Sequence, residues 1–261
     1  MAFNKDSTLG TIGVVAVLCL VCSIVVSVAA VGLRPAQLAN KALDKQTNIL
    51  AVAGLDVSNV AKTYGDRIEA RLVNLTTGEF VTDGSFGDPD DFDMLAAAKD
   101  PAKNQLLAGA DDRAGLKRIA KVMPVYLAKG EDGQVDSIIL PIYGQGLWST
   151  MYAFLAVAPD GQTVKGITYY DHGETPGLGG EIENPAWREL FIGKKLFGDD
   201  GKLALQIIKG HAPEGSEHEV DGLSGATLTS NGVQHTFEFW MGSNGFGPFL
   251  AKLRAGELNN G

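Results

Sequence analysis

The sequence predicts an α+β fold, in which a twisted, largely antiparallel sheet is flanked by helices and preceded by one N-terminal transmembrane helix. Three observations support this prediction. The chain begins with a long uncharged apolar run, its second half groups β-rich runs between Gly/Asp turns, and helix-like segments flank these runs. The length of 261 residues suffices for an anchor and one sizeable domain. The net charge of −9 argues against a nucleic-acid partner.

The apolar run covers residues 9–33, which are 25 residues without a charge, and follows a short tail at 1–8. At about 1.5 Å per residue it is roughly 37 Å long, enough to cross a bilayer. A cleaved signal peptide is the alternative, because residues 27–29 resemble a small-x-small cleavage site. The run exceeds the usual signal-peptide core of about 7–15 residues, so we expect an uncleaved anchor. More basic residues follow the run than precede it, which slightly favours a cytoplasmic C-terminal domain.

The only cysteines, Cys19 and Cys22, lie inside this apolar run. The rest of the chain therefore has no disulfide and no thiolate metal site. In such a setting we expect the two cysteines to be small buried residues. A redox role is the alternative.

Residues 34–120 are predicted to form a membrane-proximal helical and mixed region. Its expected parts are an amphipathic helix at 38–53, a helix at 57–64, a helix or strand at 67–74, a Gly/Asp-rich loop or short strands at 76–93 and a mixed, polar surface insertion at 96–121. The acidic cluster at 90–93 lacks the Gly and Glu spacing of a calcium loop, so we expect solvated side chains there.

Residues 121–261 are predicted to form the main domain. The expected strands lie at 122–128, 135–142, 151–157, 164–170 and 203–209. The expected helices lie at 184–190, 227–240 and 248–255.

One turn in this domain has the features of a ligand site, Asp221-Gly-Leu-Ser-Gly-Ala-Thr227. Gly225 allows a positive φ and close approach of a ligand to the backbone. Thr227 falls at the start of the last long helix, where unpaired N–H groups and the helix dipole favour a phosphate. A simple Ser/Thr helix cap is the alternative.

Two glycine-rich loops accompany this turn. The first loop, at 143–149, contains Gly144, Gly146 and Trp148, and its glycines let the backbone approach a flat ligand. A core Trp in a hairpin loop is the alternative. The second loop begins at His172, which has no second His or Cys at metal spacing. There is no GxSxG elbow, and we assign neither a catalytic residue nor a metal ligand.

Three motifs together resemble a known family: Gly144-Gln-Gly-Leu-Trp148, His172-Gly-Glu-Thr-Pro-Gly-Leu-Gly179 and Asp221-Gly-Leu-Ser-Gly-Ala-Thr227. This is the FMN-binding domain family in which a threonine holds the FMN covalently. With the anchor and the length, the chain resembles the C subunits of the bacterial sodium-translocating NADH:quinone oxidoreductases.

The resemblance implies that residues 121–261 form a covalent FMN-binding domain, with FMN attached by a phosphoester to Thr227 rather than to the nearby Thr229. A separate flavin transferase makes this bond from FAD, and Asp221 belongs to the motif that it recognises. The implied cofactor contacts are Asp221, Ser224, Gly225, Ala226, Leu147, Trp148, Glu174, Thr175, Gly177, Leu178 and Gly179.

The resemblance also implies a place in the cell. The chain would relay electrons in a six-subunit sodium-pumping NADH:ubiquinone reductase of the bacterial inner membrane. Its flavin domain would be periplasmic, against the charge pattern. Two alternatives remain open, namely the flavin subunit of an Rnf-type electron-transport complex and a non-redox, membrane-tethered assembly module.

Overall fold

The computed structural model describes residues 7–257, so residues 1–6 of the predicted tail 1–8 lie outside the described residues. The chain divides into two compact units, residues 1–45 and 46–261. Each unit is described by itself.

Helix α1 (Thr8–Val52) forms nearly all of the described part of the first unit. Its last residues, from Gln46 onward, belong to the second unit. Of the described helices, α1 alone has the length and composition of a membrane span. Along residues 14–33 its apolar side chains are exposed all around, as in a helix that faces lipid. Cys19 and Cys22, predicted to be buried, are exposed on this helix. Only lipid or a partner helix could bury their thiols.

Helix α1 continues through Pro35. The helical stretch predicted at 38–53 is therefore the end of the same helix as the anchor. Proline removes one backbone hydrogen bond and disturbs the turn before it. A helix of 45 residues keeps enough other bonds to continue past this point.

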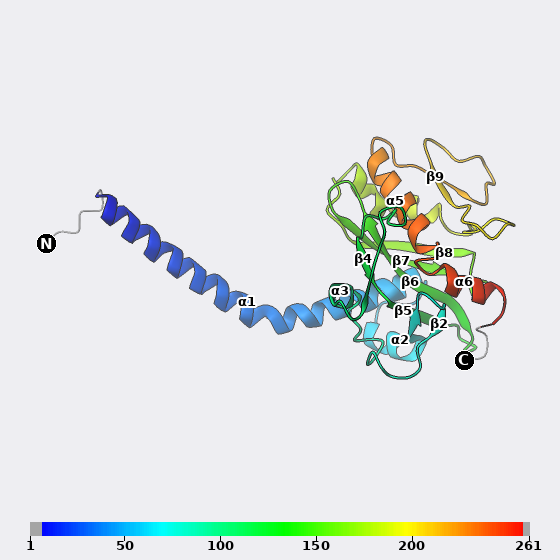
Figure 1. Ribbon diagram of the computed structural model, residues 1–261, viewed down its shortest axis with the longest axis horizontal. Helices are drawn as coiled ribbons and strands as arrows, with labels where there is room; N and C mark the ends of the chain where they lie inside the picture. The colour runs from blue at the N-terminus through cyan, green and yellow to red at the C-terminus, as the bar shows by residue number, and fades with distance from the viewer. Residues whose placement is uncertain (1–6, 258–261) are drawn as a thin grey trace. The chain divides into compact units, whose positions relative to one another are not determined.

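A six-stranded sheet in the order β2-β1-β5-β6-β7-β8 forms the centre of the second unit (Figure 1), and each neighbouring pair of its strands is antiparallel. Its strands are β1 (Ile68–Asn74), β2 (Glu79–Phe80), β5 (Val122–Lys129), β6 (Val135–Gln145), β7 (Thr150–Val157) and β8 (Val164–Asp171). The predicted fold class is confirmed. The segment at 67–74, for which helix and strand were both open, is strand β1.

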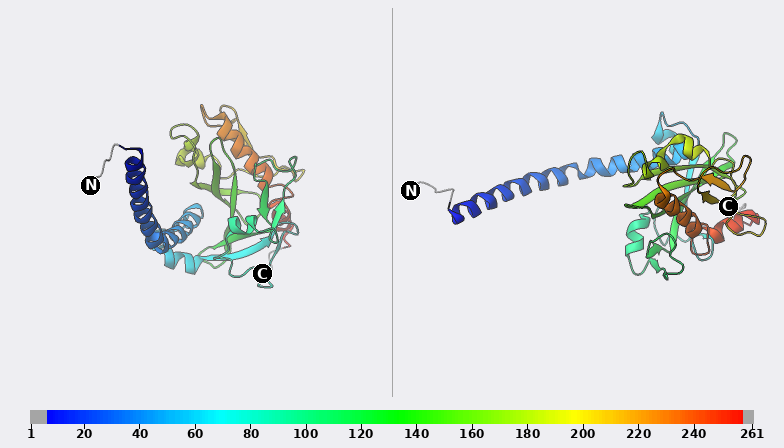
Figure 2. Two further views of the ribbon diagram at one scale, coloured as in Figure 1. Left: turned by 60° about the vertical axis from the view of Figure 1, so that its left-hand side comes forward. Right: turned by 90° about the horizontal axis from the view of Figure 1, so that it is seen from above.

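Helices pack on both faces of the sheet (Figure 2). One face carries α5 (Thr227–Trp240) and α6 (Gly247–Arg254) over the larger core. The other face carries the end of α1 and helix α2 (Val60–Arg67). Because successive strand residues point to opposite faces, Leu155 belongs to the first core and its neighbour Phe154 to the second.

Shorter elements surround the sheet. They are α3 (Met94–Lys99), β3 (Asn104–Leu106), β4 (Arg118–Ala120), η1 (Gly179–Glu183), α4 (Pro185–Glu189), β9 (Gln206–Ile208) and β10 (Glu219–Asp221). The strand predicted at 203–209 is shorter than expected and does not join the main sheet. It is β9, which pairs in parallel with β10. The loop at 209–218 returns the chain to the start of β9, so that both strands run in the same direction.

Strands β1 and β2 come from the predicted membrane-proximal region 34–120, yet they pair into the same sheet as the strands of 121–261. The compact unit therefore begins at Gln46. Sequence spacing could not show this, because the pairing of β1 with β5 joins Ile68 to Ala128 across a long insertion. The functional division between anchor and flavin-binding part stays a prediction.

Two glycines allow a matched test of this packing. A Cβ at Gly144 would lie 2.1 Å from Thr236 Oγ1 of α5, whereas a Cβ at Gly65 in α2 would meet nothing within 4 Å. We expect Gly144→Ala to lower the free energy of unfolding by about 1–3 kcal/mol through overpacking. Gly65→Ala should raise it by up to about 1 kcal/mol, because Ala is the better helix former. Urea unfolding of the detergent-solubilised chain measures both, and equal effects would contradict the packing described.

Candidate functional site

Helix α5 begins at Thr227 without a side-chain cap. Ala226 is the N-cap residue and makes no side-chain capping bond, and the first intrahelical bond runs from Ser230 N to Ala226 O. The Thr227 side chain is exposed. Gly225 has a φ of +74°, so a side chain at this position would strain the turn. The first turn thus presents free N–H groups beside an open hydroxyl, which suits an anion.

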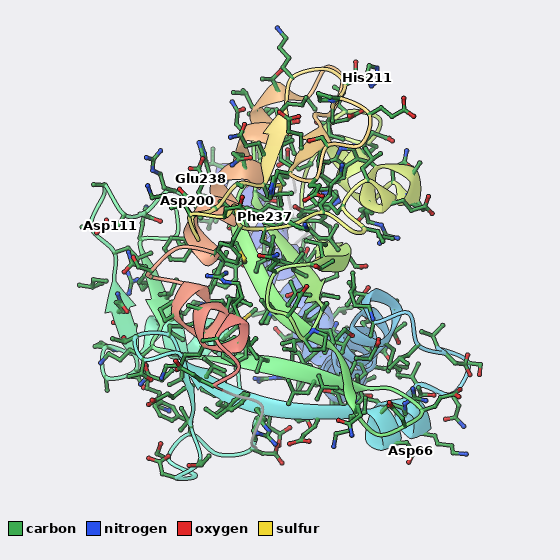
Figure 3. All side chains as sticks on the ribbon, turned by 90° about the vertical axis from the view of Figure 1, so that its right-hand side faces the viewer. Asp66, Asp111, Asp200, His211, Phe237 and Glu238 are labelled. Atoms are coloured by element: carbon green, nitrogen blue, oxygen red, sulfur yellow. The ribbon has the colours of Figure 1, made fainter. Side chains whose placement is uncertain are left out.

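A cavity of about 320 Å³ lies in front of this helix start. Its lining includes Ser224, Gly225 and Thr227 of the turn, and also Lys209 and His211 of the loop after β9. Figure 3 shows the His211 side chain on the loop at the outer edge of the unit. Neither basic residue was predicted from the sequence, because no local motif marks them. They reach the site through the parallel pairing of β9 with β10 and the contact of β9 with α5.

Asp221 holds the basic loop in place. Its Oδ1 accepts a hydrogen bond from Ala212 N at 2.7 Å, and its Oδ2 lies 2.7 Å from His211 Nδ1. The backbone N–H of Ala212 and the His211 ring, against a smaller opposing effect of burial, hold the pKa of the Asp221 carboxyl below its usual range. The carbonyl of Asp221 accepts from Trp187 Nε1 at 2.7 Å. Asp221 therefore acts on the neighbouring loop rather than pointing at Thr227.

Glu174 is buried on the other side of the helix start. Its Oε2 accepts from Thr229 Oγ1 at 2.5 Å, and its Oε1 accepts from Trp148 N at 2.9 Å. Thr229 is 1% exposed, so its hydroxyl is enclosed while that of Thr227 is open. Of the two threonines, the structure leaves only Thr227 accessible.

Large apolar side chains are exposed on the two glycine loops and next to Thr227 on α5. Trp148 is 67% exposed, and Leu147, Leu178 and Leu228 are exposed as well. Trp148 Nε1 donates to Thr175 Oγ1 at 3.1 Å, which ties the first glycine loop to the second. The alternative of a core Trp at position 148 is wrong. We call these four side chains the apolar wall. Glu174 connects the first loop to Thr229, and Leu178 lies next to Gly225, so the wall is near the start of α5, and flat ligands cover surfaces of this kind.

The glycines of the first loop are needed for contacts within the protein. A Cβ at Gly144 would strike Thr236, and one at Gly146 would lie 2.5 Å from Glu174 Oε1. Protein groups therefore approach both glycines closely, and an approach by a flat ligand stays a prediction. In the second loop, Gly177 has a φ of +75° in open space, and a Cβ at Gly179 would lie 2.7 Å from Glu174 Oε2.

His172 supports the second loop. Its Nδ1 accepts from Glu174 N at 3.1 Å, and its Nε2 lies 3.0 Å from Glu183 Oε1. Within residues 7–257 no group of three or more His, Cys, Asp or Glu is arranged to hold a metal ion. The three motifs thus converge on the start of α5, while His172 braces the loop behind it.

Comparison with known proteins agrees with this convergence. The FMN-binding domain family matches residues 146–242, which include all three loops except the first two residues of the first motif. Two curated relatives are C subunits of Na(+)-translocating NADH-quinone reductases, and each is 56% identical over 99% of this chain. They come from Yersinia pestis, with 97% of the relative covered, and Vibrio alginolyticus, with 100%. The chain belongs to the family of these C subunits.

Solved structures of this family share the fold. The crystal structure of Shewanella oneidensis NqrC has a TM-score of 0.77 and 37% identity, covering 83% of this chain and 99% of that one. The crystal structure of the C subunit from Parabacteroides distasonis has a TM-score of 0.65 and 32% identity, covering 84% and 96%. The resemblance inferred from the three motifs is therefore confirmed.

The role of Asp221 leads to a prediction about the basic loop. Asp221→Ala removes both acceptors, so we expect faster hydrogen exchange at the Ala212 amide, whereas Glu214→Ala, an exposed residue of the same loop, should leave it unchanged. The pKa of Asp221 is lower in the folded than in the unfolded chain. The stabilisation of the loop by its carboxylate is therefore complete above about pH 3.9 and is lost as the pH falls through the lowered pKa. Wild-type protection at Ala212 should therefore approach that of the variant in acid. Equal protection in all three proteins at pH 7 would refute this role.

Proposed function

We propose that the chain carries FMN as a phosphoester on Thr227 Oγ1 and relays electrons within a sodium-pumping NADH:ubiquinone reductase. One observation carries the proposal: the open hydroxyl of Thr227 stands at an uncapped helix start, facing a cavity with Lys209 and His211. A phosphate there would meet free N–H groups, the positive helix end and basic side chains.

The residues present fit the rest of FMN. Leu147, Trp148 and Leu178 offer apolar surface to the isoalloxazine ring. The proposed phosphate contacts are Ser224, Gly225 and Ala226 beside Thr227. Thr175 already bonds to Trp148, and the carboxylate of Glu174 points inward, so the geometry favours supporting roles for both.

Attachment uses Thr227 as the nucleophile. The family resemblance implies a flavin transferase that uses FAD. The Thr227 oxygen would form a bond to the FMN phosphorus as the phosphoanhydride bond of FAD breaks, AMP would leave, and the hydroxyl proton would pass to solvent. The ester fixes the flavin in one place, and the bound flavin supplies the electron transfer. We assign no catalytic base.

Helix α1 is the proposed single-pass anchor, with the flavin domain on the periplasmic side of the bacterial inner membrane. The charge pattern favours the opposite side, but long domains translocate largely regardless of charge. The proposed partners are the other subunits of a six-subunit complex. Membership in the family of C subunits favours this complex over the Rnf-type alternative.

The attachment site can be tested on a denaturing gel. After co-expression with a flavin transferase, the chain should give a fluorescent band, and Thr227→Val should abolish it because the open hydroxyl at the helix start is lost. Thr229→Val should keep a band, since that hydroxyl is enclosed by Glu174. A wild-type band without fluorescence would contradict covalent FMN and would favour the alternative that the chain is a non-redox assembly module.

The side of the membrane can be tested with C-terminal fusions. A periplasmic domain makes an alkaline phosphatase fusion active and a green fluorescent protein fusion dark. The reverse pattern would place the flavin domain in the cytoplasm, as the flanking charges favour.

A further inference from the structure

The carboxylate of Glu174 joins three segments that are far apart in the sequence. It accepts from Trp148 N in the loop after β6 and from Thr229 Oγ1 in the first turn of α5, while Glu174 itself lies after β8. Glu174 is 5% exposed. A buried carboxylate is tolerated only when its oxygens are satisfied, so these donors are needed for the fold.

The backbone around the carboxylate is built to approach it closely. A Cβ at Gly146 would lie 2.5 Å from Oε1, and a Cβ at Gly179 would lie 2.7 Å from Oε2. Both glycine loops therefore lie directly on the Glu174 side chain. Two other hydrogen bonds, from Gly173 N to Ser149 Oγ at 2.6 Å and from Trp148 Nε1 to Thr175 Oγ1 at 3.1 Å, join the two loops to each other but not to α5.

The apolar wall depends on these loops. Leu147 and Trp148 follow Gly146 directly, and Leu178 precedes Gly179. Each of the three side chains thus lies no more than two residues along the chain from a residue that contacts the carboxylate, and this contact fixes its position. Thr227, the proposed attachment residue, is two residues from Thr229 on the same helical turn.

We propose that Glu174 is a positioning residue, whose carboxylate fixes the Leu147–Trp148 segment and the Leu178 turn against α5 and so sets the width of the flavin site. The residue touches no flavin atom and acts through the loops. This inference rests on the proposed FMN site. We call the two hydrogen bonds of the carboxylate, to Trp148 N and to Thr229 Oγ1, the Glu174 lock; they are present in the chain before flavin is attached.

The lock requires an ionised carboxylate, since only this form accepts from all its donors. Burial alone would raise the pKa of Glu174. The hydrogen bonds from Thr229 and from the backbone of Trp148, Leu147 and Ser149 outweigh burial and hold the pKa below its usual range. The lock is therefore closed at neutral pH and opens as the pH falls through the lowered pKa.

The first test needs no flavin. Glu174→Gln in the full, flavin-free chain replaces one acceptor oxygen by an amide donor, so we expect a several-fold faster hydrogen exchange at the Trp148 amide. Glu189→Gln, an exposed carboxylate on α4, is the matched control and should not change that rate. An unchanged rate in Glu174→Gln would overturn the lock.

The second test uses the flavin-loaded chain and separates positioning from direct contact. Thr229→Val keeps the carboxylate but removes its donor on α5. If Glu174 acts by positioning, both Thr229→Val and Glu174→Gln shift the visible circular dichroism of the flavin and raise its quenching by iodide, and the double variant adds little. If the carboxylate touches the flavin, only Glu174→Gln changes these signals, and the proposal fails.

The two tests also separate the lock from the FMN proposal. Absence of flavin on the wild-type chain would refute the FMN site alone, because exchange at Trp148 is still measured. If Glu174→Gln does not fold, Thr229→Val decides: slower or unchanged exchange at Trp148 overturns the lock, and faster exchange supports it.

Discussion

A buried carboxylate needs hydrogen-bond donors, and this requirement organises the site. Glu174 takes its donors from the loop after β6 and from the first turn of α5. Because the donors come from separate elements, the carboxylate can be satisfied only when the sheet and α5 are packed together. It also decides which threonine is open. Thr229 is turned inward to Glu174, and Thr227 is left facing the cavity.

The fold provides a second, independent support at the other end of the cavity. There β9 and β10 pair in parallel, and Asp221 binds the loop that carries Lys209 and His211. The Trp187 side chain bonds to the Asp221 carbonyl and packs against Phe191, which stacks on Phe237 of α5. The phosphate end and the ring end of the proposed site are therefore held by different carboxylates and meet at the start of one helix.

Much of this could be predicted from local sequence. The strands β5 to β8, helix α5 and the open turn at Gly225 follow from alternation, turn residues and cap chemistry within short windows. Contacts between distant segments could not be predicted in this way. The basic residues Lys209 and His211 have no local motif, and Gly146 looked like a ligand contact because its real neighbour, Glu174, lies far along the chain. The continuation of α1 through Pro35 also escaped prediction, because proline weakens a helix without always ending it.

The central claim is that Thr227, at the start of α5, is the hydroxyl that carries covalent FMN. Mass spectrometry of the tryptic peptide spanning residues 210–252, taken from the chain purified with its native partners, tests this most directly. We expect the peptide to carry the mass of FMN less one water, and fragmentation to place that mass on Thr227. An unmodified peptide, or FMN on Ser224, Thr229 or Ser230, would contradict the claim.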